Sequence, residues 1–290
     1  MQLDGPLVST QWLATHLTEP RLRVFDTTVI LQPKTDGFGY LALSGRDAWA
    51  SAHIPGAGFL DVIAELSDRG SDLPFMMPPA AAFAQAMAAH GVGDDSAVVL
   101  YNQGVPMWST RVWWMLRSIG FDNVAVLNGG WDKWQKEGRV VSNEMPGHAT
   151  ARLTLKPRPA MWVDKGAMLH MLEAHGPVTL NALSPAVYSG EKNQYGRPGH
   201  LPGTHNVFYG DLIEPTTGEF LPPDKLRPLF AASAALASER VIAYCGGGIS
   251  ATMDALALLL CGQANVAIYD GSMSEWVKDP ALPLVLGHQP

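Results

Sequence analysis

Short apolar runs recur along the chain, and each is followed by a turn rich in glycine or asparagine and then by a helix-forming segment. The runs at residues 98–101, 124–127, 241–244 and 266–269 are apolar throughout, which predicts strands that are buried on both faces. Strands that alternate with helices are typical of a parallel sheet covered by helices. We therefore expect an α/β fold.

The second half of the chain repeats the features of the first half in the same order. A strand expected at 22–25 corresponds to one at 178–180, and the turn HIPGA at 53–57 is echoed by HLPGT at 200–204. Helices are expected at 45–52, 79–90, 109–119, 224–237 and 251–260. A duplication of this length predicts two copies of one domain. We expect domains at 1–143 and 161–290, joined by a linker at 144–160 that is rich in Pro, Gly and Arg.

The segment VIAYCGGGISATMDALALLL at 241–260 holds the strongest candidate for chemistry. Cys245 comes directly after the expected strand and shortly before the expected helix. The turn between them consists of Gly246, Gly247, Gly248, Ile249 and Ser250. The N–H groups of such a turn and the positive end of the helix dipole stabilise a thiolate over a thiol.

A lone cysteine is usually a small buried hydrophobe, but three consecutive glycines carry an entropy cost that a structural turn seldom needs. We interpret Cys245 as a nucleophile and residues 246–250 as the loop that stabilises its anion. Asn102 stands at the equivalent position of the first copy and cannot act as this nucleophile, so the first copy is expected to be inert.

Composition limits the other classes of function. The 290 residues are 47% hydrophobic with a net charge of −7, and no basic run suggests nucleic-acid binding. The first residues, MQLDGPLVSTQWLATHL, lack the pattern of a signal peptide, and no apolar stretch has membrane-spanning length. Cys245 and Cys261 are too few for a disulfide framework and fit a reducing compartment, which predicts a cytoplasmic enzyme.

The chain resembles the tandem-domain sulfurtransferases of the rhodanese family, which include thiosulfate and 3-mercaptopyruvate sulfurtransferases. The resemblance rests on HIPGA, RVWWMLRSIGFDNVAVLNGGW, GHLPGTHN, the cysteine loop and NVAIYDGSMSEW, which match in order and spacing. It implies two rhodanese-like domains, each a central parallel sheet with helices on both faces.

The resemblance also implies a reaction. Cys245 takes sulfane sulfur from a small donor as a persulfide and passes it to a thiol or cyanide acceptor, while the N–H groups of residues 246–250 stabilise the anions. No metal and no organic cofactor is implied, and a thioredoxin-like reductant is a candidate partner.

The residues after Cys245 bear on the donor. Thiosulfate-preferring members of the family carry Arg and Lys at the positions of Gly246 and Gly247, so that anion clamp is missing here. Mercaptopyruvate-preferring members carry Gly-Ser-Gly, which is closer to this loop, and 3-mercaptopyruvate is the favoured donor. Yet the serine and histidine of their Ser-His-Asp relay correspond to Gly247 and Phe75, and a substrate-binding arginine corresponds to Val187.

Other residues are candidates for the missing roles. Arg197, in YGRPGHLPG, either binds an anionic donor or has a structural role, whereas Lys192 is interpreted as a solvated loop charge. Ser250 donates to the sulfur or caps the following helix. Met107 and Trp108 either line a cleft between the domains or pack in the core.

Several alternatives remain open. The alternatives to transfer from 3-mercaptopyruvate are a thiosulfate:cyanide sulfurtransferase and a protein-fed persulfide relay with little turnover of small donors. A cysteine phosphatase is disfavoured because the loop lacks the arginine that holds phosphate. His53 and His200 recur in both copies, so a structural role in the turn is expected, and Cys261 is expected to be buried and inert.

Overall fold

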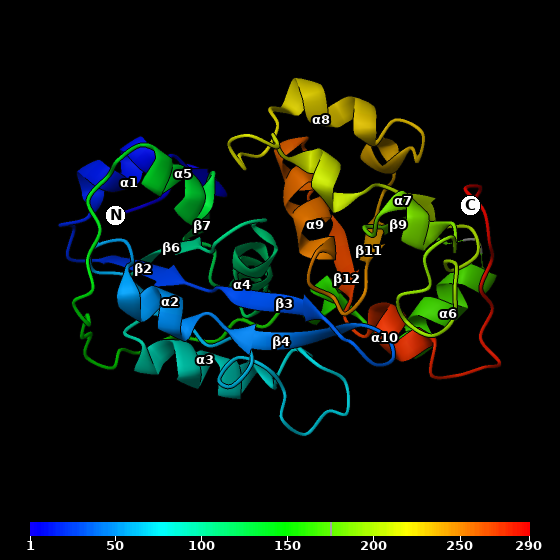
Figure 1. The fold of residues 1–290 in the computed structure, drawn as a ribbon, viewed down its shortest axis with the longest axis horizontal. Helices are drawn as coiled ribbons and strands as arrows, with labels where there is room; N and C mark the ends of the chain where they lie inside the picture. The colour runs from blue at the N-terminus through cyan, green and yellow to red at the C-terminus, as the bar shows by residue number, and fades with distance from the viewer. Residues whose placement is uncertain (175) are drawn as a thin grey trace.

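The computed structural model describes residues 1–174 and 176–290, which form two α/β units side by side (Figure 1). The elements of the first unit are β1 (Leu7–Val8), α1 (Thr10–His16), β2 (Leu22–Asp26), β3 (Val29–Pro33), β4 (Tyr40–Ser44), α2 (Arg46–Ser51), β5 (Gly58–Phe59), α3 (Ala80–Ala89), β6 (Ala97–Tyr101), α4 (Met107–Ser118), β7 (Val124–Leu127) and α5 (Gly130–Lys136).

The second unit begins with a 3-10 turn at Pro159–Met161. Its elements are β8 (Trp162–Val163), α6 (Lys165–Glu173), β9 (Val178–Asn181), α7 (Pro185–Tyr188), β10 (His205–Asn206), η2 (Tyr209–Leu212), α8 (Pro223–Leu229), η3 (Ala235–Ala237), β11 (Val241–Tyr244), α9 (Ala251–Leu260), β12 (Val266–Tyr269) and α10 (Ser272–Trp276).

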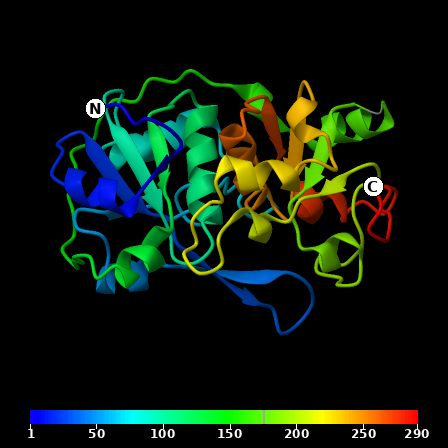
Figure 2. The ribbon, with the colours of Figure 1, turned by 90° about the horizontal axis from the view of Figure 1, so that it is seen from above.

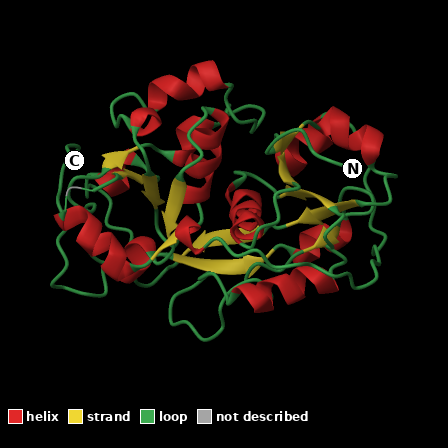
Figure 3. Cartoon of the chain, turned by 180° about the vertical axis from the view of Figure 1, so that it is seen from behind, coloured by secondary structure: helices red, strands yellow, loops and turns green. Residues whose placement is uncertain are grey.

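Each unit is built on a five-stranded parallel sheet. The strand order is β5-β2-β6-β7-β1 in the first unit and β10-β9-β11-β12-β8 in the second, so the two sheets have the same topology. The strands β6, β7, β11 and β12 are buried at every position, as their unbroken apolar sequences predict. Figure 3 shows the strands of each unit lying between helices. The prediction of two tandem α/β domains is confirmed.

The helices α4 and α9 lie side by side where the two units meet (Figures 1 and 2). Each helix is followed by a glycine with a left-handed φ, Gly120 at 91° and Gly262 at 93°. Thr110 and Thr252 each lie ten residues before that glycine, and their hydroxyl oxygens are 2.8 Å apart. Equivalent residues of the two copies therefore touch at the centre of the interface.

The antiparallel hairpin of β3 and β4 was not predicted from the sequence. It extends from the first unit toward the second (Figure 1). Ile30 pairs with Leu43 in its register, and both side chains are exposed, as is that of Leu41. At its tip, the ring of Phe38 lies 3.5 Å from the position that a Cβ on Gly196 would take. The hairpin thus brings part of the first unit close to the second.

Two expected helices have different bounds in the structure. The helix expected at 109–119 begins earlier, at Met107. The helix expected at 224–237 ends at Leu229, and only a 3-10 turn follows at Ala235–Ala237. The chain reverses between them because Ala234 adopts a left-handed φ of 54° and the Ser233 hydroxyl donates to the Phe230 carbonyl. Within the described residues, no helix is both long and apolar enough to cross a membrane.

Residues 144–158 contain no helix or strand. They run along the first unit, where the Ala151 N–H donates to the Ala88 carbonyl and the Lys156 N–H to the Ile119 carbonyl. The segment is therefore fixed against the first unit along part of its length. The domain bounds of 1–143 and 161–290 stay a prediction.

Candidate active site

Cys245 lies directly after β11, at the carboxyl end of the central strand of the second sheet. This is the edge of an open parallel sheet at which ligands bind. Its side chain is almost fully buried, with 1% of its surface exposed. The loop then turns through residues 246–250 and enters α9 at Ala251.

Hydrogen bonds to the carbonyl groups fix the orientation of the loop peptides. The carbonyl of Cys245 accepts from the Met273 N–H at 3.1 Å, and that of Gly246 accepts from the Ser274 N–H at 2.8 Å and from its hydroxyl at 2.6 Å. Because a trans peptide holds its C=O and N–H on opposite sides, the N–H groups of Gly246 and Gly247 point away from α10. Within the described residues, neither N–H has an acceptor, so both are available to an anion.

Ser272 closes the base of the loop. Its hydroxyl oxygen accepts from the N–H groups of Cys245 and Gly248, each at 3.1 Å, and donates to the Tyr269 carbonyl at 2.7 Å. Gly248 has a left-handed φ of 71°, and a Cβ there would lie 2.7 Å from a carboxylate oxygen of Asp270. The third glycine is therefore required both by its backbone conformation and by the space available.

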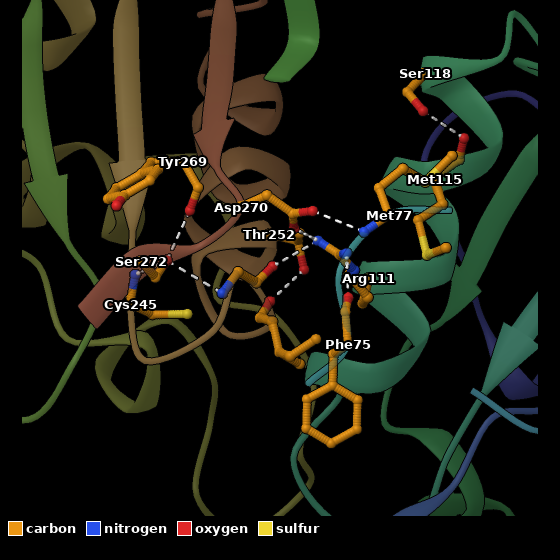
Figure 4. A network of polar contacts seen from close by, with 12 residues as sticks. Phe75, Met77, Arg111, Met115, Ser118, Cys245, Thr252, Tyr269, Asp270 and Ser272 are labelled. Atoms are coloured by element: carbon orange, nitrogen blue, oxygen red, sulfur yellow. Dashed lines mark hydrogen bonds and ion pairs between the residues drawn. The ribbon is translucent and has the colours of Figure 1, made fainter. Parts of the chain in front are cut away.

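The first unit contributes a buried arginine to this loop. Arg111 lies on α4 with no exposed surface, and its Nη1 donates to the Gly248 carbonyl at 3.1 Å and to Asp270 Oδ1 at 2.6 Å. Its Nη2 donates to the Phe75 carbonyl at 2.7 Å. Figure 4 shows this guanidinium reaching from α4 toward Asp270, whose other carboxylate oxygen accepts from the Met77 N–H.

The bond from Arg111 also orients a peptide of the loop. Since Arg111 holds the Gly248 carbonyl on one side, the Ile249 N–H must point to the other side. This N–H has no acceptor within the part of the chain that the structure describes. Three N–H groups of the loop, those of Gly246, Gly247 and Ile249, are thus left without partners by contacts from α10 and from the first unit.

Cys245 opens onto a pocket of about 550 Å³ that lies between the two units. From the first unit, the pocket is lined in part by Lys34, Phe38, Tyr40, Phe75, Met107 and Trp108. From the second unit, it is lined in part by Val187, Lys192, Tyr195, Tyr209, Ser274 and Lys278. Each unit thus contributes aromatic side chains to the walls, and three lysines stand among the residues that line the pocket.

The structure brings most of the predicted site residues together and sets Gly248 and Arg197 apart. Gly248 is outside the residues that line the pocket, and its N–H donates to the Ser272 hydroxyl, so its predicted role in stabilising the anion is wrong. Gly246, Gly247, Ile249 and Ser250 line the pocket with Cys245. The side chain of Ser250 makes no capping hydrogen bond to α9, so the capping role is wrong.

Arg197 is outside the residues that line the pocket. Its guanidinium donates to the carbonyls of Asp279 and Leu282, both at 2.8 Å. These two bonds favour the structural role that the sequence left open for Arg197.

Tyr195 explains why the residue after Cys245 is a glycine. A Cβ at Gly246 would lie 1.9 Å from the hydroxyl oxygen of Tyr195, far closer than nonbonded atoms approach. At Gly247, the nearest atom to such a Cβ is the Ser274 hydroxyl oxygen at 3.8 Å. The Tyr195 hydroxyl therefore occupies the space beside Gly246, and burial, together with the nearby Cys245, raises the pKa of this phenol above its usual range.

Sequence reasoning missed Arg111, Tyr195 and the lysines Lys34 and Lys278. Arg111 was visible as a charge inside the apolar helix RVWWMLRSIGF, where a buried arginine requires a partner. Tyr195 and the lysines stand in loops or at the ends of elements, where no sequence pattern marks their proximity to Cys245.

The other residues considered from sequence have structural contacts. The imidazole nitrogens of His53 and His200 each lie 2.7–3.0 Å from backbone carbonyls in equivalent turns, which fits the structural role expected of them. Cys261 is buried and free, and burial raises the pKa of its thiol. Among the described residues, no group of three His, Cys, Asp or Glu side chains could hold a metal ion.

Comparisons with known proteins agree with this geometry. A profile of the rhodanese-like domain matches residues 9–137 and 188–279. The human 3-mercaptopyruvate sulfurtransferase is 34% identical over 95% of this chain and 93% of its own length, and the mouse thiosulfate sulfurtransferase is 32% identical over 94% and 92%. The crystal structure of SseA from Escherichia coli, a 3-mercaptopyruvate sulfotransferase, is 29% identical with a TM-score of 0.81, covering 92% of this chain and 98% of that one.

Proposed function

The chain belongs to the rhodanese family of sulfurtransferases, and we propose that it transfers sulfane sulfur from 3-mercaptopyruvate to a thiol or cyanide acceptor. In this proposal, Cys245 carries the sulfur as a persulfide. The observation on which it rests is the position of Cys245: a buried thiol beside three unpartnered N–H groups, at the wall of a pocket large enough for the donor.

The loop suits a sulfur atom that is an anion before and after transfer. The thiolate of Cys245 attacks the sulfur of the donor, the bond between that sulfur and carbon breaks, and the cysteine retains the sulfur as a persulfide. The N–H groups of Gly246, Gly247 and Ile249 offer hydrogen bonds to both anions, in the manner of an oxyanion hole. An acceptor thiolate or cyanide then attacks the outer sulfur and regenerates the Cys245 thiolate.

The lysines of the pocket are suited to hold the donor carboxylate. Lys34 comes from the tip of the hairpin, Lys192 from the loop after α7 and Lys278 from the segment after α10. They bring positive charge from three directions to a pocket in a chain whose net charge is −7. In this proposal they take the anion-binding role that the sequence left open for Arg197, whose guanidinium binds two carbonyls elsewhere.

The space beside Cys245 argues against thiosulfate as the main donor. An arginine at Gly246, as in thiosulfate-preferring relatives, would overlap the Tyr195 hydroxyl, so the pocket is built for a loop without that cation. The mouse relative is nevertheless named a thiosulfate sulfurtransferase. Thiosulfate:cyanide transfer therefore stands as the second candidate, and a protein-fed persulfide relay, with a thioredoxin-like acceptor, as the third.

Intact-protein mass spectrometry separates these candidates. Reduced protein and its Cys245→Ser variant are incubated separately with 3-mercaptopyruvate and with thiosulfate. We expect the mass to increase by one sulfur atom with 3-mercaptopyruvate and only in the protein with Cys245. An increase with thiosulfate alone would reverse the assignment of the donor, and no increase with either would favour the protein-fed relay.

A further inference from the structure

The proposed donor creates a need for a proton beside Cys245. When the thiolate attacks the sulfur of 3-mercaptopyruvate, the electron pair of the breaking S–C bond moves onto the carbon and forms the enolate of pyruvate. That enolate must gain a proton to leave as pyruvate. The serine and histidine that would form a relay in mercaptopyruvate-preferring relatives are Gly247 and Phe75 here, so neither position supplies the proton.

The hydroxyl groups in the wall of the pocket are the candidate proton donors considered first. The hydroxyls that line it belong to Tyr40, Ser184, Tyr195, Tyr209, Ser250 and Ser274. Ser274 is engaged, because its hydroxyl donates to the Gly246 carbonyl at 2.6 Å. Tyr195 is distinguished by its contact with the loop, since its oxygen lies 1.9 Å from where a Cβ of Gly246 would be. Gly246 is the neighbour of Cys245 in the chain, so this phenol borders the peptide next to the nucleophile.

The hydrogen bonds of Tyr195 leave its proton free. The side-chain amide of Gln194 donates to the Tyr195 oxygen at 3.1 Å. Within the described residues, the phenol proton itself has no acceptor. Gln194 therefore orients the ring oxygen and would stabilise a transient phenolate, while the O–H remains available to the contents of the pocket. Because burial and Cys245 raise the pKa of Tyr195, the phenol is protonated at neutral pH.

We propose that Tyr195 is the catalytic acid of the sulfur-uptake step and protonates the enolate carbon of the departing pyruvate. This inference rests on the proposed function and adds the residue that completes its chemistry. The Cys245 thiolate forms an S–S bond as the S–C bond breaks, and Tyr195 gives its proton to the carbon. The new persulfide then returns its S–H proton to the Tyr195 phenolate. The products are pyruvate and a persulfide anion, with no other reactant and no net change at Tyr195.

The test compares two sulfur donors whose leaving groups differ. Cys245 is loaded in a single turnover with 3-mercaptopyruvate and, separately, with inorganic tetrasulfide. The reaction is quenched at set times, and the loaded protein is measured by intact-protein mass spectrometry. The polysulfide leaving group of tetrasulfide needs no proton. Tyr195→Phe is expected to slow loading from 3-mercaptopyruvate by about 100-fold, the lower range for loss of a general acid. Loading from tetrasulfide should be unchanged.

Tyr209→Phe is the matched control, because Tyr209 also lines the pocket and its pKa is also raised, mainly by burial. This variant should not reproduce the selective loss of loading from 3-mercaptopyruvate. If Tyr195→Phe slows loading from both donors equally, or slows neither, the acid role of Tyr195 is overturned while the proposed function stands. If the unmodified protein loads from tetrasulfide but never from 3-mercaptopyruvate, the proposed donor fails and the acid role fails with it.

Discussion

Replacing Arg111 with methionine should disturb both the stability of the protein and the reactivity of Cys245. The change keeps an unbranched side chain but removes the donors to Asp270, to the Gly248 carbonyl and to the Phe75 carbonyl, at 2.6, 3.1 and 2.7 Å. It leaves the carboxylate of Asp270, 9% exposed, without its cation. Removing one partner of a buried ion pair costs about 3–5 kcal/mol of folding free energy, and we expect a loss of that size.

The effect on Cys245 has a different cause. Without Arg111, nothing within the described residues holds the Gly248 carbonyl, and the peptide that carries the Ile249 N–H can rotate. The anion of Cys245 then loses a hydrogen-bond donor that the loop otherwise presents. Alkylation of Cys245 by iodoacetamide at neutral pH should therefore be slower in Arg111→Met.

A double variant separates these contributions. Urea unfolding gives the change in stability, and the double variant Arg111→Met with Asp270→Asn should recover part of it, because no buried carboxylate remains. The double variant should not recover the rate at which Cys245 is alkylated, since the Gly248 carbonyl still lacks its donor.

Arg117→Met on the same helix is the control. Arg117 pairs with Asp122 at 3.6 Å and stacks on Trp113, all within the first unit. Its loss should lower stability without changing the rate at which Cys245 is alkylated. If Cys245 is alkylated at the normal rate in Arg111→Met, the claim that the first unit orients the loop is refuted.

Two other predictions follow from the same contacts. Gly246→Ala should lower sulfur loading and reduce the folding free energy by about 1–3 kcal/mol through overpacking, because its Cβ would lie 1.9 Å from the Tyr195 oxygen. Gly247→Ala is the comparison, since its Cβ would lie 3.8 Å from the nearest atom. This variant should load normally in the same mass-spectrometric assay. Burial raises the pKa of Asp26 from 3.8 to about 6, against the opposing effect of its hydrogen bonds. Because its pKa is raised in the folded state, the contribution of Asp26 to stability is fully present below pH 3.8 and is lost, by about 3 kcal/mol in total, as the pH rises through 6. Asp26→Asn should remove this dependence in urea unfolding at pH 4 and pH 7, since Asn181 makes the corresponding turn in the second unit.

Much of the fold could be predicted from the sequence because its signals are local. The strands at Val124–Leu127 and Val266–Tyr269 were located from unbroken apolar runs, and the two copies were recognised from the order of their turns. The hairpin of β3 and β4 gave no such signal. Its apolar residues Ile30, Leu41 and Leu43 face solvent, so they do not follow the alternation of a half-buried strand.

Some residues of the site could likewise be predicted from local sequence, and others could not. The strand, the cysteine and the loop are contiguous in sequence, so their arrangement follows from local patterns. Arg111, Tyr195 and Lys34 reach the same pocket from distant parts of the chain, and only the packing of the two units brings them there. The residue most favoured as a cation, Arg197, was chosen because it precedes a recurring turn, but its guanidinium binds the C-terminal segment.

The loss of activity that we infer for the first unit has a physical basis in its own loop. Asn102, at the position equivalent to Cys245, donates from its side-chain amide to the carbonyls of Gln103 and Val105, at 2.7 and 2.8 Å. Its oxygen accepts from the N–H and the hydroxyl of Ser109. The side chain therefore bonds within its own loop, and the N–H groups of Gln103 and Gly104 donate to Thr28 Oγ1 and Asp132 Oδ2, where the second unit leaves N–H groups open to an anion. The first unit contributes Arg111 and part of the pocket wall to the site at Cys245.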